Sequence, residues 1–88
     1  SAAKGAMIAF TKSLSLEVAR YGVRVNAVAP GVIDSEMTKD LDLKEMKKNI
    51  PLKRLGYAEE VAECVFFLSD KASYVTGEVL NVSGGLVR

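Results

Sequence analysis

The residue types that most often perform chemistry in proteins are scarce in this chain of 88 residues. It has no histidine and a single cysteine, Cys64. The chain alone therefore cannot supply a Ser-His-Asp or Cys-His arrangement, and we predict no metal site. Cys64 lies in the middle of an apolar helical stripe, which favours a packed thiol over a reactive one. Lysines, hydroxyl groups and the backbone remain as candidates.

A Pro-Gly pair marks a turn where a ligand could bind. Pro30 and Gly31 follow residues 23–29, a short Val-rich run that predicts a buried strand. Ligands of open α/β sheets bind just outside the carboxyl ends of the strands. Proline fixes the direction in which the chain leaves the strand, and glycine permits a close backbone approach. An ordinary strand-end turn is the alternative interpretation, and for an isolated Pro-Gly pair it is the better one.

The positive charges give two weaker candidates. Lys4, taken alone, is best interpreted as a solvated helix lysine. The pairs Lys47-Lys48 and Lys53-Arg54 could dock an acidic partner, although a solvated loop explains them more simply. The net charge of +1 argues against a nucleic acid or a membrane surface as partner. With 49% apolar and 26% charged residues, we expect a folded, soluble, cytoplasmic protein.

The elements that would position these residues follow from hydrophobic spacing. The pattern predicts a helix over residues 1–21, ended by Gly22, with two apolar strips that indicate two neighbours, one of which could be a second subunit. Asp42 and Glu45 form a capping pair that opens a short helix. A third helix begins near Ala58, and residues 78–82 predict a second strand.

This order of elements predicts a parallel, right-handed βαβ unit. Two parallel strands alone would leave two open edges, and such sheets usually have more strands and two covered faces. Lys4 would also oppose the helix dipole if the helix began at residue 1. We therefore expect residues 1–88 to be the C-terminal segment of one doubly wound, Rossmann-like α/β domain whose upstream part is absent.

Six strings in the sequence resemble the C-terminal third of short-chain dehydrogenase/reductases. They are S-A-A-K at 1–4, R-V-N-A-V-A-P-G at 24–31 with the following V-I-D-S-E-M-T, P-L-K-R-L-G at 51–56, A-E-E-V-A at 58–62 and Y-V-T-G-E-V-L-N-V-S-G-G at 74–85. Among the subfamilies, the chain is most similar to bacterial β-ketoacyl-acyl-carrier-protein reductases. It departs from the usual pattern at Ala58, where proline is common, and at Ser83, where an acidic residue is common.

The resemblance assigns roles to five residues. Lys4 matches the lysine of the family's Tyr-x-x-x-Lys motif, whose tyrosine would fall immediately before residue 1. An ammonium one helical turn from a phenol lowers the pKa of the phenol, which then serves as general acid to a carbonyl. The lysine also binds the nicotinamide ribose. Pro30, Gly31, Ile33 and Ser35 match the segment that contacts the nicotinamide carboxamide or a phosphate, and residues 36–55 match the substrate lid.

The resemblance thus implies reduction of a carbonyl by NADP or NAD, with a 3-oxoacyl thioester as the expected substrate, free or carrier-bound. It implies fatty acid biosynthesis as the context and a homo-oligomer, a dimer or tetramer, as the assembly. The isolated chain should be inactive, because the catalytic serine and tyrosine and the Gly-rich turn belong to the upstream half. Two alternatives remain open, namely a non-catalytic oligomerisation fragment and a reductase for another carbonyl or alcohol.

Overall fold

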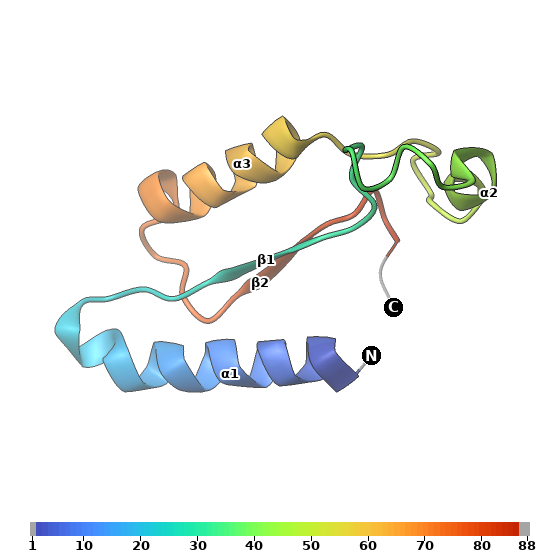
Figure 1. Cartoon of the computed structure of the whole chain (residues 1–88). Coiled ribbons are helices and arrows are strands. Elements are labelled where there is room, and N and C mark those ends of the chain that lie inside the picture. The colour runs from blue at the N-terminus through green and yellow to red at the C-terminus, as the bar shows by residue number, and fades with distance from the viewer. Residues whose placement is uncertain (1, 87–88) are drawn as a thin grey trace.

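Residues 2–86 are described in the computed structural model, in which a two-stranded sheet separates two helices (Figure 1). The elements in chain order are α1 (Ala2–Val18), the 3₁₀ turn η1 (Ala19–Tyr21), β1 (Ala27–Pro30), α2 (Leu43–Lys48), α3 (Ala58–Phe66), the π-helical turn η2 (Phe67–Lys71) and β2 (Val79–Val82). Helix α1 covers one face of the sheet and α3 the other, while α2 lies beyond the carboxyl ends of the strands. The predicted Rossmann-like layering is confirmed.

The two strands pair in parallel, with Ala27 opposite Val79 and Pro30 opposite Val82. The pairing begins later than the sequence predicts, because residues 23–26 bind the turn before β2 in another way. The amide of Val25 donates to Thr76 Oγ1, 3.0 Å away, and the Val25 carbonyl accepts from Gly77 N at 2.7 Å. Side chains and single backbone bonds therefore replace the ladder in the first half of the predicted strand.

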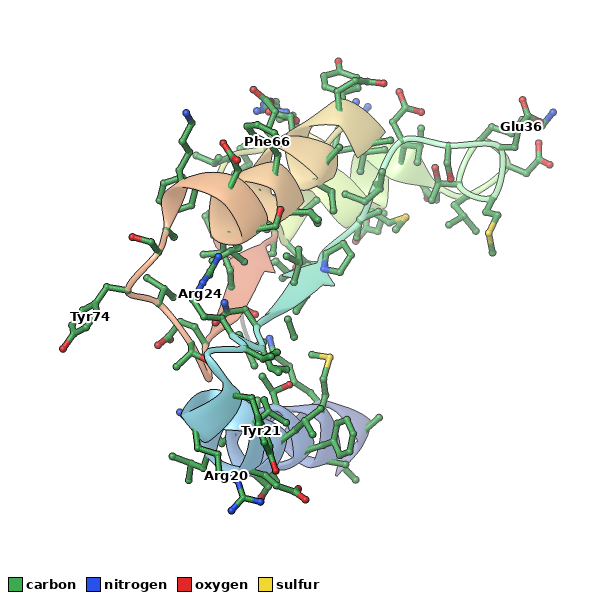
Figure 2. The ribbon with its side chains drawn as sticks, turned by 90° about the vertical axis from the view of Figure 1, so that its left-hand side faces the viewer. Arg20, Tyr21, Arg24, Glu36, Phe66 and Tyr74 are labelled. Carbon is green, nitrogen blue, oxygen red and sulfur yellow. The ribbon has the colours of Figure 1, made fainter. Side chains whose placement is uncertain are left out.

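Two side chains hold the η2–β2 connection against the chain that leads into β1. Asn26 donates from Nδ2 to Val75 O and accepts from Glu78 N, both at 3.0 Å, which agrees with its interpretation as a structural residue. The Arg24 guanidinium, which reaches towards the end of η2 in Figure 2, caps the helix carbonyls. Its nitrogens donate to the carbonyl oxygens of Leu68 (2.7 Å), Ala72 (3.0 Å), Ser69 (3.0 Å) and Val75 (3.2 Å).

Helix α1 buries two small polar side chains most deeply, whereas its larger apolar side chains are half-buried or exposed. Thr11 and Ser15 are buried and donate to carbonyls of their own helix, at 2.7 Å each. A Cβ at Gly77 would lie 2.8 Å from Ser15 Oγ, so the backbone before β2 comes very close to this face. Phe10 and Tyr21 stay 67% exposed. Met7, Leu14 and Val18, which share the helical spacing of Phe10 and Tyr21, are half-buried, so the apolar strip is only partly covered within residues 2–86.

The core is small for the length of the chain. Ile50, Leu55, Leu68 and Ala72 are its buried apolar residues within the described part. The radius of gyration is 14.9 Å, against roughly 12 Å for a compact domain of this length. The described protein is thus an open, layered structure. None of its helices within residues 2–86 combines the length and the apolar character that crossing a membrane requires.

Candidate functional site

Lys4 lies in the first turn of α1, at the end of the sheet where both strands finish (Figure 1). Its side chain is half-buried, and Nζ donates a hydrogen bond to the side-chain oxygen of Asn81 on β2. Asn81 is the register partner of Ala29, next to the Pro-Gly turn. The lysine that the motif singles out is therefore directed at the carboxyl end of the sheet, where the other candidate residues begin.

Pro30 and Gly31 form the exit from β1, as the sequence predicts, and Gly31 N donates to Val82 O at 2.9 Å. The need for glycine at position 31 has a local cause. A Cβ there would lie 2.9 Å from both Cα and Cβ of Ser83, closer than real Cβ atoms come to other atoms. The close backbone approach that we expected at this glycine is thus made by the residue that follows β2.

The next residues, which include Ile33 and Ser35, are held by short-range bonds on two sides. On one side, Ile33 forms an isolated parallel bridge with Gly56. On the other, Thr38 Oγ1 donates to Ile33 O and accepts from Ser35 N, both at 2.9 Å. The Thr38 hydroxyl therefore fixes the turn that presents Ser35, whose own side chain is exposed.

The segment that corresponds to the expected lid projects from this end of the molecule, with Glu36 near its tip (Figure 2). The predicted capping pair is confirmed, since Asp42 Oδ1 accepts from Glu45 N at 3.2 Å at the start of α2. The base of the segment is anchored by buried Ile50 and Leu55. Leu52 N also donates to Gly84 O at 3.0 Å, which ties the base to the chain that leaves β2.

One ion pair closes the base of this segment onto α3. Arg54 Nη1 and Nη2 each lie 2.9 Å from one of the two carboxylate oxygens of Glu60, and Glu60 Oε1 also accepts from Tyr57 N at 3.0 Å. The hydrogen bonds from Arg54 and, to a smaller extent, the hydrogen bond from the Tyr57 amide together lower the pKa of Glu60 from its ordinary value of 4.5 to about 2. The hydrogen bond with Glu60 raises the pKa of Arg54.

The remaining sequence candidates have ordinary environments. Cys64 is a half-buried free thiol on α3. Lys48 pairs with Glu45 at 3.2 Å, and Lys53 Nζ donates to Lys48 O at 2.7 Å. Two cations of the basic pairs are thus already engaged within the loop, which agrees with their interpretation as parts of a solvated loop. Residues 2–86 contain no group of three or more His, Cys, Asp or Glu side chains that could hold a metal ion.

The sequence and the fold of the chain are similar to those of known proteins. A family model described as Enoyl-(Acyl carrier protein) reductase matches residues 1–87. The chain belongs to the short-chain dehydrogenase/reductase family. Its strands and helices correspond to those of the C-terminal part of that family. The similarity to bacterial 3-oxoacyl-[acyl-carrier-protein] reductases that the motifs indicate is confirmed.

Two curated relatives in this family are 3-oxoacyl-[acyl-carrier-protein] reductases. The protein of Buchnera aphidicola (subsp. Schizaphis graminum) is 51% identical over 90 residues, and the human protein is 52% identical over 86. Each match covers 98% of this chain but only 37% and 36% of the respective relative. The chain therefore spans little more than a third of the length of these relatives.

Solved structures of the family agree with the fold. A 3-oxoacyl-[acyl-carrier protein] reductase from Brucella melitensis superposes with a TM-score of 0.91 at 42% identity, over 97% of this chain and 33% of that one. YwfH, an NADPH-dependent reductase involved in bacilysin biosynthesis, superposes with a TM-score of 0.85 at 29% identity, over 96% of this chain and 37% of its own.

Several residues of this short-chain dehydrogenase/reductase site were not singled out by the sequence analysis. Asn81, Thr38 and Glu60 bind or shape the candidate residues, yet each is an ordinary polar residue in its local sequence, and Arg54 was considered only as part of a basic pair, not as the partner of Glu60. Arg54 lies in the loop and Glu60 in α3, so no single helical or strand period relates the two residues. A signal exists only for Thr38, because a hydroxyl three residues after Ser35 is a common turn partner.

Proposed function

We propose that this chain forms the C-terminal portion of an NAD(P)-dependent reductase that acts on 3-oxoacyl thioesters. The observation that carries the proposal is the placement of Lys4, the residue that matches the family's motif lysine, at the same end of the sheet as residues 30–35. The names of the Buchnera, human and Brucella relatives support the substrate class. The name of YwfH supports a nicotinamide coenzyme.

The exit segment from β1 fits a nicotinamide carboxamide through its backbone. Val32 O and Asp34 N are the groups that bond Gly56, so the N–H of Ile33 points to the opposite side. Within residues 2–86 this N–H donates no hydrogen bond, which leaves it available to a carbonyl oxygen. Ser35 adds an exposed hydroxyl two residues later. The coenzyme, when bound, supplies the hydride; these residues bind and orient it.

Lys4 serves in the proposed enzyme as the cation that activates a phenol. The motif that it matches has its tyrosine four residues upstream on the same helix, and side chains at that spacing are neighbours. A fixed ammonium stabilises the phenolate and lowers the pKa of the tyrosine, so that the phenol can donate its proton to the carbonyl oxygen near neutral pH. Asn81 orients the lysine by accepting a hydrogen bond from Nζ.

The loop over residues 36–55 would cover the bound substrate and exclude water from it. Its anchored base and charged tip suit a lid, because Ile50 and Leu55 are buried while the tip residue Glu36 is exposed. A thioester carried by an acyl carrier protein would enter at this face. We propose that the complete protein is a homo-oligomer, and fatty acid biosynthesis is the context that the relatives' names support.

A purely structural assembly role is the second candidate, and the outer face of α3 favours it. Phe66, on α3 in Figure 2, and Phe67 are more than half exposed and border a cavity of about 510 Å³ together with Glu63 and Lys71. Contiguous exposed aromatic residues are typical of protein contacts. In this case the isolated chain would associate without catalysis, and sedimentation of a compact monomer would exclude it.

The proposed function is tested by assaying the complete protein that carries this segment. We expect oxidation of NADPH or NADH that depends on an added acetoacetyl thioester, and no such oxidation by the isolated 88-residue chain. Absence of coenzyme oxidation by the complete protein with either coenzyme and any 3-oxoacyl thioester would disprove the proposal. Turnover by the isolated chain would disprove the expectation that catalysis requires the upstream part of the protein.

A further inference from the structure

We propose that Arg54 and Glu60 are positioning residues that fix the backbone of Ile33 through Gly56. We call residues 32–34 and 54–57 the neck, because the loop leaves and returns there. This inference rests on the proposed function, in which Ile33 binds the coenzyme. The pair itself is not expected to contact substrate or coenzyme; it sets where the exit segment of β1 lies.

The first step is that the carboxylate of Glu60 accepts hydrogen bonds from residues on both sides of Gly56. Glu60 accepts both Arg54 nitrogens at 2.9 Å and the Tyr57 amide at 3.0 Å. Arg54 Nη1 also donates to Leu55 O at 3.0 Å. The guanidinium and the carboxylate are planar and bonded twice, which fixes their relative orientation as well as their distance. Residues 54–57 are therefore held rigidly to the first turn of α3.

The second step is that the backbone of Gly56 binds residues 32–34, the other segment of the neck. Gly56 O accepts from Asp34 N at 2.9 Å, and Gly56 N donates to Val32 O at 3.0 Å. These two bonds are those of a parallel bridge and leave little freedom to the residue between them, Ile33. A Cβ at Gly56 would lie 3.1 Å from Ile33 Cδ1, so the two segments of the neck are also in close contact.

The third step distinguishes the effect of the pair on the position of Ile33 from its effect on the stability of the protein. The side chains of Arg54 and Glu60 are 48% and 36% exposed. Ion pairs with this exposure contribute little to the free energy of unfolding. Their geometry can still matter greatly to a binding site, because a displacement of about 1 Å at reacting groups can cost on the order of 100-fold in rate. The pair should therefore affect coenzyme binding more than folding.

The test uses the complete protein with Arg54→Met, which removes the pair but leaves the Glu60 contact with the Tyr57 amide. The matched control is Lys48→Met, because Lys48 also belongs to an ion pair of the loop, with Glu45, but lies outside the neck. We expect Arg54→Met to raise the KM for the coenzyme by roughly 10-fold to 100-fold with a smaller fall in kcat. Arg54→Lys should recover part of the loss, since one ammonium cannot form both bonds.

A merely structural role would lower the fraction of folded enzyme, which reduces the apparent kcat and leaves KM unchanged. That result, or an equal rise in KM for Lys48→Met, would overturn the inference. Amide hydrogen exchange without coenzyme gives an independent reading. Exchange at Asp34 and Gly56 should accelerate in Arg54→Met and not in Lys48→Met. If the wild-type protein binds no coenzyme, the proposed function fails alone, whereas unchanged exchange at these two amides overturns the positioning role.

Discussion

Gly31 has no room for a side chain, which makes it a sharp test at the scale of single residues. An added Cβ would lie 2.9 Å from Ser83, whereas a Cβ at Gly5, in α1, meets no described atom within 4 Å. We expect Gly31→Ala to lower the free energy of unfolding of the complete protein by about 1–3 kcal/mol, as overpacking does. Gly5→Ala should raise it by about 0.5–1 kcal/mol, because alanine favours the helix.

Urea denaturation of both glycine variants gives the measurement. Equal effects of the two substitutions would show that the contact between the ends of β1 and β2 does not control position 31. The requirement for glycine would then have to come from the coenzyme or from another part of the complete protein.

Residues whose role is set by their neighbours in sequence could be predicted. Gly22 ends the first helical segment with a left-handed φ of 74°, and Asp42 caps α2. The partner of Lys4 could not, because Asn81 lies 77 positions away and only the fold brings it near. The same holds for Ser83, whose contact with Gly31 depends on the strand register.

At the scale of elements, the order of helices and strands followed from periodicity, but the two most deeply buried positions of α1 did not. A hydrophobic pattern marks the residues that prefer burial, whereas Thr11 and Ser15 are polar and yet buried, and at Ser15 the close approach of the Gly77 backbone leaves little room for a larger side chain. Their hydroxyls are satisfied within the helix, so this burial costs little. Phe10 stays exposed, and a second neighbour for α1 stays a prediction.

The junction between the loop and α3 has a defined dependence on pH. Glu60 has a pKa of about 2 in the folded protein, below its ordinary value of 4.5. Because the folded pKa is the lower one, the contribution of the pair is complete above about pH 4.5 and is lost as the pH falls towards 2. Because the pair is exposed, its contribution is small, so in the complete protein we expect only a small difference in unfolding free energy between wild type and Glu60→Gln above pH 4.5, and this difference should shrink across the window.

Denaturation midpoints measured at several pH values check this expectation. Glu45→Gln is the control, since Glu45 also pairs with a lysine of the loop but has no bond to the neck. If the difference between wild type and Glu60→Gln stays constant down to pH 2, the Arg54–Glu60 bonds do not hold the carboxylate in its charged form.

At the scale of the whole molecule, the sequence predicted a layered α/β structure, which the described residues show, and the absence of an upstream part stays a prediction. Apolar side chains such as Leu16, at 80% exposure, and Phe66, at 58%, stay largely in contact with water. A groove of about 640 Å³ lies between residues 22–28 and the helical segment α3–η2, and both polar and apolar residues line it, among them Arg24, Val28 and Leu68. The sequence predicts further strands, since two parallel strands have open edges, but it could not indicate which surfaces of the described residues stay exposed.

The central claim is that Lys4 supplies the cation of a reductase site, and one comparison of rates tests it most directly. Lys4→Met and Lys12→Met remove the same group from the same helix, and Lys12 Nζ lies 3.5 Å from Gly77 O, away from the candidate site. In the complete protein, we predict that Lys4→Met lowers kcat/KM for the 3-oxoacyl thioester by at least about 100-fold, while Lys12→Met stays near wild type. Equal kcat/KM values for Lys4→Met and the wild-type protein would contradict the account.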